Sequence, residues 1–207
     1  MRHMIIFGIA GSLLLLSLLS LSNLQVIATE SDKSNSIGIC CAWNSKLADG
    51  ELSFKISGGD ETARNAVRDA IKEWEIVQDL TLTEISGKEK IDINVQFKKG
   101  GGMIAGQALR KFDGNSFIDS VQIQISGSAF GTPSNVATVK QITRHEMGHA
   151  LGIGHANFDG DLMSTTVQSG SENVSICDIN GVKAANHLKF EDNSSPHHPH
   201  TDHVHCT

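Results

Sequence analysis

The alternation of hydrophobic and polar positions predicts a mixture of strands and helices between residues 52 and 188. Apolar side chains at every second position are typical of half-buried strands. This pattern occurs in five segments: 52–56, 80–85, 91–97, 104–109 and 121–125. Apolar spacings of three and four are typical of amphipathic helices, and they occur in three segments: 63–77, 135–151 and 175–188. The order of strand, helix, strands, helix and helix predicts an α+β or α/β-like sandwich with helices packed on a mixed sheet.

The predicted helices have recognisable first and last residues. Asp60, Ser134 and Ser175 precede the three helical patterns, and their side-chain oxygens can accept hydrogen bonds from the free N–H groups of a first helical turn. Gly152 follows the second pattern, where a helix end favours a residue that accepts positive φ. We therefore expect the second helix to stop at about residue 151.

The first 28 residues have the features of an export signal. Met1, Arg2 and His3 are followed by an apolar run over 4–21, and a charged start before an apolar run is the order of a secretory signal. Small residues at positions 26 and 28 suit a signal peptidase and predict cleavage after residue 28. The run is also nearly long enough to cross a bilayer, so an uncleaved anchor over 4–24 is the alternative. Both interpretations place the remaining chain outside the cytoplasm, secreted or membrane-anchored.

Charge and cysteine content narrow the class of protein. Seventeen Lys and Arg residues against 23 Asp and Glu residues give a net charge of −6. A chain without a basic block is not expected to bind nucleic acid, because phosphate contacts need clustered cations. Four cysteines are too few to build a disulfide scaffold, so we expect a hydrophobic core. We expect a leader over 29–42, one domain over 43–191, and a disordered histidine-rich tail over 192–207.

The four cysteines allow three complete disulfide pairings. Adjacent cysteines rarely pair with each other, because the geometry is strained. The favoured interpretation is that Cys40, Cys41 or both are joined to Cys177 or Cys206. A free thiol that acts on a metal is the alternative.

Residues 145–155 carry the candidate chemistry and read H-E-M-G-H-A-L-G-I-G-H. Positions i and i+4 of a helix project from one face, so His145 and His149 can both reach one metal ion. Glu146 lies about 100° around the helix and flanks that site. His155 can join as a third ligand only if the chain turns back after the helix, and Gly152 stands where that turn is needed.

Three neutral imidazoles and one water form a tetrahedral zinc site with an open position, which is the catalytic rather than the structural pattern. Zinc lowers the pKa of its water, and Glu146 is placed to act as the general base. The motif therefore predicts hydrolysis of amide bonds with one catalytic zinc. At ordinary frequencies of His and Gly, chance produces such a motif about once in a hundred thousand chains of this length. A polar helix without metal, or a zinc site without catalysis, is the remaining alternative.

H-E-x-x-H-x-x-G-x-x-H followed by a methionine turn is the metzincin signature, and the chain resembles the matrixin branch of that clan. Met163 follows the third histidine at matrixin spacing, and the resemblance covers roughly residues 43–190. It implies a twisted, mostly parallel mixed sheet on two long helices, an active-site cleft over the zinc helix, and a small C-terminal subdomain with the methionine turn and a final helix. It also implies a monomeric endopeptidase whose extended polypeptide substrate pairs with an edge strand: Ile104, Ala105, Gly106, Gln107, Ala108 and Leu109.

The chain departs from the matrixin pattern in three places. There is no histidine between residues 4 and 144, so the second, structural zinc of many matrixins is not expected. Asp113 and Asp119 are the only carboxylates in the region of the matrixin calcium loop, so calcium dependence has little support. Ser164, Thr165 and Thr166 replace the tyrosine and proline that often follow the methionine turn, so substrate preference does not carry over.

The histidine-rich tail supports a different class of function. Five histidines and Cys206 crowd into residues 197–207, and histidine tracts bind zinc, copper or nickel. We interpret the chain as an exported zinc endopeptidase with a solvated tail. The alternatives are a non-catalytic extracellular zinc-binding or adhesion module, and a metal-sequestering protein in which the tail is the working part.

Overall fold

The computed structural model describes residues 34–207 except for 48, 88–89, 103, 130–131, 134, 167–172 and 187–197. The expected signal peptide or anchor, the first part of the leader and the tail residues 192–197 therefore lie outside the described residues. No helix within the described ranges is both long and apolar enough to cross a bilayer.

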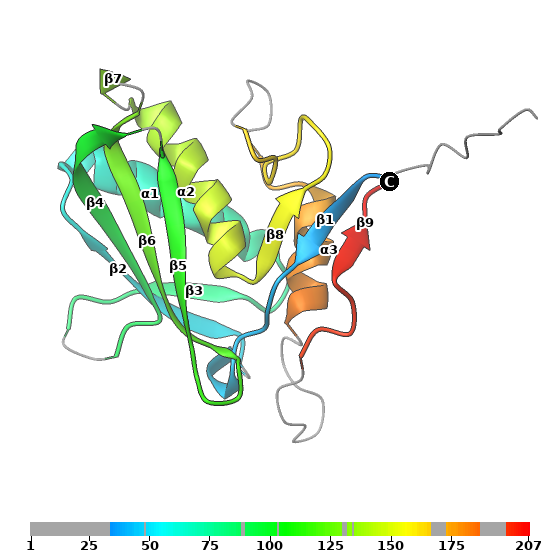
Figure 1. Ribbon diagram of the computed structural model, residues 1–207. Helices are drawn as coiled ribbons and strands as arrows, with labels where there is room; N and C mark the ends of the chain where they lie inside the picture. The colour runs from blue at the N-terminus through cyan, green and yellow to red at the C-terminus, as the bar shows by residue number, and fades with distance from the viewer. Residues whose placement is uncertain are drawn as a thin grey trace, which may run out of the picture. The chain divides into compact units, whose positions relative to one another are not determined.

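A six-stranded mixed sheet forms the larger layer (Figure 1). Its strand order is β3-β2-β4-β6-β5, with β7 paired to β6. The strands are β2 (Glu51–Ser57), β3 (Thr81–Glu84), β4 (Ile93–Gly102), β5 (Gly106–Phe112), β6 (Ile118–Ala129) and β7 (Thr132–Pro133). The pairs β2–β3, β2–β4 and β4–β6 are parallel, whereas β5 and β7 run antiparallel to β6. The expected mostly parallel mixed sheet is confirmed, and β5 is its edge strand.

Helices cover one face of this sheet. The helical segments are α1 (Glu61–Glu73), α2 (Val136–Ala150) and two short 3₁₀ turns, η1 (Ser45–Leu47) and η2 (Trp74–Ile76). Asp60 caps α1 as predicted, while Asn135, one residue after the predicted Ser134, caps α2 by accepting from the Thr138 N–H. Strand alternation directs one set of side chains into the core under the helices: Leu52, Phe54, Ile93, Val95, Val121, Ile123 and Ile125.

Two buried tryptophans and an ion pair fix α2 in place. Trp74 donates from Nε1 to the Arg144 carbonyl (3.1 Å), and Trp43 donates to the Ala150 carbonyl (2.9 Å). Arg144 forms a bidentate pair with Glu73 of α1. Because buried donors are costly to leave unsatisfied, these contacts give α2 a defined height and rotation above the sheet.

The second layer is a three-stranded antiparallel sheet of order β8-β1-β9 beside α3 (Figure 1). Its elements are β1 (Ser36–Ile39), β8 (Ile153–Ala156), β9 (His203–His205) and α3 (Ile176–Ala185). Two expectations are wrong here. The leader segment contains the central strand β1, because Ile37 is fully buried against the core. The described end of the tail is not disordered, because β9 pairs with β1 and Cys206 is bonded to α3.

The favoured disulfide pairing is also wrong. Cys177 is joined to Cys206, and Cys40 is joined to its neighbour Cys41. The antiparallel course of β9 explains this, because the Cys206 N–H donates to the Asn35 carbonyl at the start of β1. Cys40 and Cys41 follow the opposite end of β1, about five residues or roughly 16 Å further along an extended strand. The tail therefore passes α3 within reach of Cys177 and leaves the adjacent pair to each other.

Candidate active site

The structure brings the three predicted histidines together from two elements. His145 and His149 lie one turn apart on α2, and His155 comes from β8. The ring centroid of His149 is 4.7 Å from each of the other two, and those two are 5.4 Å apart. One possible ligand atom from each residue lies within 4.8 Å of the others. This spacing suits a single ion between three imidazoles.

The turn between helix and strand requires glycine. Gly152 has φ of 97° and lies between the last turn of α2 and β8. A β-carbon at this position would collide with the Cys41 carbonyl oxygen and would come within 3.2 Å of the Ala185 side chain. Since only glycine adopts this backbone conformation without strain, Gly152 allows the chain to return and present His155.

The histidine rings are held in the orientation that metal ligands need. Nδ1 of His145 lies 2.7 Å from the Leu162 carbonyl oxygen, and Nδ1 of His149 lies 3.0 Å from the Ile153 carbonyl oxygen. A carbonyl only accepts, so Nδ1 carries the hydrogen and Nε2 keeps its lone pair for a metal. Burial lowers the pKa of all three imidazoles, to about 3 for His149. Nε2 of His149 lies 3.2 Å from Nε2 of His155, and neutral imidazoles whose ring nitrogens converge in this way fit a zinc ion.

Glu146 lies against this cluster and is almost completely buried. Burial raises the pKa of its carboxyl to about 7, against the opposing effects of the Ala108 backbone N–H and the Arg110 charge. Its Oε2 atom has no hydrogen-bond partner within the described structure. An orphaned buried acceptor is costly, and a water held at the site would satisfy it.

A cleft of about 700 Å³ runs between β5 and the histidines. Of the six residues predicted as the substrate strand, five line this cleft, namely Ile104, Ala105, Gly106, Gln107 and Ala108. Leu109 does not line the cleft, and its side chain is exposed. The strand itself begins at Gly106, later than predicted. Ser164, Thr165 and Thr166 form part of the opposite wall.

Gly106 brings the edge strand close to the buried carboxylate. A β-carbon there would lie 2.8 Å from Glu146 Oε1 and would collide with the Ile142 side chain. Only a residue without a side chain therefore allows β5 to approach α2 this closely. The weak apolar pattern with an internal glycine was the signal for this approach.

Arg110 is a cleft residue that the sequence analysis missed. From β5, its Nε donates to the His149 carbonyl (2.7 Å) and its Nη2 lies 3.4 Å from the Ile153 carbonyl. Burial lowers the pKa of the Arg110 guanidinium, while the charge of Glu146 opposes that shift. Arg110 thus joins the edge strand to the carbonyls at the end of α2 and the start of β8. The alternation of Gly106, Ala108 and Arg110 on one strand face could have indicated it.

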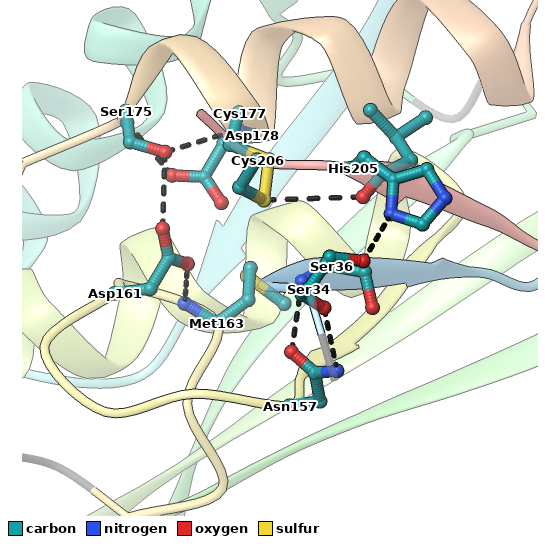
Figure 2. The surroundings of a disulfide bond; sticks show 11 residues. Ser34, Ser36, Asn157, Asp161, Met163, Ser175, Cys177, Asp178, His205 and Cys206 are labelled. Atoms are coloured by element: carbon teal, nitrogen blue, oxygen red, sulfur yellow. Dashed lines mark hydrogen bonds between the residues drawn. A yellow bond between two sulfur atoms is a disulfide. The ribbon is translucent and has the colours of Figure 1, made fainter. Parts of the chain in front are cut away.

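Met163 is fully buried beneath α2. A β-carbon on Gly148 would lie 2.5 Å from the Met163 sulfur, so the helix rests directly on this side chain. The Met163 N–H donates to Asp161, and Asp161 is linked through the Ser175 hydroxyl to the first turn of α3 (Figure 2). The methionine turn is thereby tied to α3.

Asp178, in the first turn of α3, extends this buried polar network (Figure 2). It accepts from the Ser175 N–H (2.7 Å), while its own N–H donates to the Ser175 hydroxyl (3.0 Å). Burial, together with the neighbouring Asp161 carboxylate, raises the pKa of the Asp178 carboxyl. This capping network was predicted only as far as Ser175.

The sequence profile of the matrixin peptidase family matches residues 42–186. This range holds the histidine cluster, the methionine turn and α3. The chain belongs to the matrixin family. As a matrixin, it joins a family of peptidases, and its triad of histidines fits the zinc that this family uses.

Three curated relatives show similarity over part of this matrixin. Metalloendoproteinase 1 of Glycine max is 25% identical over 138 residues, which are 60% of this chain and 45% of that protein. The hatching enzyme of Paracentrotus lividus is 24% identical over 55% of this chain and 20% of its own length. Stromelysin-3 of Xenopus laevis is 30% identical over 49% of this chain and 23% of its own length. The chain thus spans less than half the length of each of these relatives.

Among solved structures, myroilysin overlaps with a TM-score of 0.41 at 18% identity, covering 58% of this chain and 54% of that one. The high choriolytic enzyme 1 of Oryzias latipes, a hatching enzyme and zinc protease, overlaps with a TM-score of 0.36 at 17% identity. This overlap covers 56% of this chain and 50% of the choriolytic enzyme chain. Both overlaps span little more than half of this matrixin.

Proposed function

We propose that this matrixin is a zinc-dependent endopeptidase in which His145, His149 and His155 hold the zinc and Glu146 is the general base. The observation that carries the proposal is the buried Glu146 carboxylate beside three neutral imidazoles, on the floor of a cleft bounded by a free strand edge. Met163 and Gly152 support the site, the first by packing under α2 and the second by turning the chain towards His155.

When bound, zinc would polarise the substrate carbonyl and acidify the attacking water. Glu146 accepts the proton of that water at its carboxylate and passes it to the leaving amine. The raised pKa of Glu146 suits both roles, because a group that titrates near neutrality accepts and returns a proton readily. The carbonyls of Leu162 and Ile153 keep the rings of His145 and His149 oriented.

The substrate we propose is an extended polypeptide that adds to β5 as a further strand. The outer edge of β5 has no neighbouring strand in the described sheet, and all residues of 104–108 line the cleft. Backbone pairing of this kind gives affinity with little sequence preference. Export through residues 1–28 belongs to the same proposal, as does a monomeric state.

The test is cleavage of a mixed peptide library by the zinc-loaded protein and by a Glu146→Ala variant. We expect the parent to cut peptides, and the variant to bind one zinc ion but lose at least about 100-fold in rate, the loss typical of a missing general base. The matched control is Glu75→Ala, which alters a carboxylate on η2 outside the residues that line the cleft.

A folded, zinc-loaded parent that cuts no peptide would overturn the proposal in favour of a non-catalytic zinc module. Cleavage that persists in Glu146→Ala would remove Glu146 from its role as base. Loss of zinc in Glu146→Ala would show that this residue acts on metal binding instead.

A further inference from the structure

The structure orders two histidines of the tail on one strand. His203 and His205 are separated by one residue on β9, so both side chains point to the same face, while Val204 points to the other. Both histidines are exposed, and the side chain of His203 is 45% accessible. Opposite them on β1 stand Gly38 and Ser36, whose small or absent side chains leave the imidazoles uncovered.

The arrangement of this pair closely matches that of the catalytic histidines. The ring centroids of His203 and His205 are 4.8 Å apart, with an interplanar angle of 84°. In the zinc cluster, the rings of His149 and His155 are 4.7 Å apart at 80°, and those of His145 and His149 are 4.7 Å apart at 89°. The two imidazoles on β9 therefore share the ring separation and the interplanar angle of two neighbouring histidines in the candidate active site.

Both imidazoles of the β9 pair also have an oxygen partner at Nδ1. Nδ1 of His205 lies 2.8 Å from the Ser34 hydroxyl oxygen, and Nδ1 of His203 lies 2.5 Å from a carboxylate oxygen of Asp202 (the contact of His205 with Ser34 is drawn in Figure 2). The Asp202 carboxylate only accepts, so Nδ1 of His203 carries the hydrogen and Nε2 is left as the ligand atom, while the Ser34 hydroxyl holds the ring of His205. The carboxylate of Asp202 adds a negative charge next to the position of a cation.

The strand that carries the pair is anchored at both sides. β9 pairs with β1 from Ser36 to Gly38, and Cys206, the next residue after His205, is bonded to Cys177 of α3 (Figure 2). A ligand pair that is already ordered loses less conformational entropy on binding than a pair in a free tail. The disulfide therefore converts a histidine-rich sequence into a defined pair of ligands.

We propose that His203 and His205 form a second metal site, distinct from the candidate catalytic one, which binds one first-row transition-metal ion with affinity for imidazole. Zinc and copper(II) have the required preference for nitrogen ligands. Water completes the coordination, so this exposed site with two protein ligands binds metal more weakly than the cluster of three histidines. It does not depend on peptidase activity, and its binding can be measured without substrate.

The experiment titrates Zn²⁺ into the full-length, untagged protein that already holds its catalytic zinc, with calorimetry as the readout. We expect one further ion to bind. The His203→Ala/His205→Ala variant should bind this ion at least about tenfold more weakly, since removing only the orienting partner of a metal ligand already costs that much affinity. The matched control is His198→Ala/His200→Ala, which removes two other tail histidines and should leave the second ion bound. One equivalent of Cu²⁺ should give an electron paramagnetic resonance spectrum with nitrogen coupling in the parent that is lost in His203→Ala/His205→Ala.

Peptide cleavage at saturating zinc should be equal in all these proteins, which shows that the variants fold. The proposal is overturned if no second ion binds, if His203→Ala/His205→Ala still binds it with parental affinity, or if the control variant loses it. A second ion that binds normally in a protein without peptidase activity would uphold this site while the proposed function fails.

Discussion

The six-stranded sheet and the three-stranded sheet contribute to one site in different ways. The large sheet with α1 and α2 supplies His145, His149, Glu146 and the free edge of β5. The small sheet with α3 supplies His155 and borders the methionine turn, since Ala156 donates its N–H to the Met163 carbonyl. The candidate zinc site therefore lies at the junction of two layers and is incomplete with either alone.

The two layers are also stabilised differently. The large sheet is held by apolar packing, with two tryptophans that fix α2. The small sheet joins strands from the two ends of the domain. It also has buried apolar residues, such as Ile37 and Ile153, and adds to them a disulfide and the hydrogen bonds between the methionine turn and α3. The placement of His145 and His149 on α2 therefore depends on local sequence, whereas that of His155 on β8 depends on contacts between distant segments.

The largest expected effect comes from opening the Cys177–Cys206 disulfide. A Cys177→Ser/Cys206→Ser variant should lose about 3.5 kcal/mol of unfolding free energy in urea denaturation, because the bond closes a loop with a separation of 29 residues. The matched control is Cys40→Ser/Cys41→Ser, whose loop is minimal and whose loss should cost only about 1 kcal/mol. Equal losses in the two variants would contradict the role of the longer bond in holding the small layer.

A second prediction concerns the large layer alone. Gly106→Ala should lower kcat/KM by about 100-fold, because the new β-carbon displaces the Glu146 carboxylate or the strand that carries the substrate. Zinc content and thermal stability should change much less than activity. Gly114→Ala is the control, since a β-carbon there meets nothing within 4 Å. Full activity of Gly106→Ala would show that β5 can withdraw without consequence.

The buried carboxylates of the small layer predict a dependence of stability on pH. The pKa of Asp178 is raised in the folded protein, so the folded state holds a proton that the unfolded state releases above about pH 4. The histidines of the candidate active site, whose folded pKa is lowered, contribute a rise in stability with pH. Asp178 contributes a fall in stability as pH rises from about 4 towards its raised folded pKa, with a slope of at most roughly 1.4 kcal/mol per pH unit. Asp178→Asn should flatten this slope in urea titrations at pH 4.5 and 7.5. An unchanged slope would remove Asp178 as its source.

The smallest expected effect concerns Arg110, which links β5 of the large sheet to β8 of the small one. Arg110→Gln replaces the guanidinium that donates to the His149 and Ile153 carbonyls by a shorter, neutral amide. It should weaken zinc affinity about tenfold, in the range found for groups that orient metal ligands. Arg110→Lys should restore part of that affinity, because a single donor can still reach the His149 carbonyl. Lys111→Gln, an exposed neighbour on β5, is the control. Parental zinc affinity in Arg110→Gln would limit Arg110 to a role in the cleft.

Sequence alone predicted the large layer well for a physical reason. Its strands and helices are amphipathic, so the periodicity of Ile93 and Val95 or of Ala66 and Ala70 directly records which face is buried. The spacing of His145 and His149 likewise follows from helix geometry. These features depend on neighbours close in sequence.

The small layer was predicted poorly because its information is non-local. β1 is four residues long and β9 three, and their strand partners are distant in sequence: β1 pairs with β8 and β9, and β9 pairs with β1. The pairing of Cys177 with Cys206 depends on the course of the tail past α3, which no spacing encodes. Arg110 escaped notice for a similar reason, since its partners are backbone carbonyls 39 and 43 residues away.

The most direct test of the two-layer site is X-ray absorption at the zinc edge on the parent and on His155→Ala. We expect three nitrogen ligands at about 2.0–2.1 Å and one oxygen in the parent. In His155→Ala we expect one nitrogen ligand fewer, weaker zinc binding and loss of peptide cleavage. An unchanged nitrogen count and unchanged cleavage in His155→Ala would contradict the claim that the small sheet supplies the third ligand.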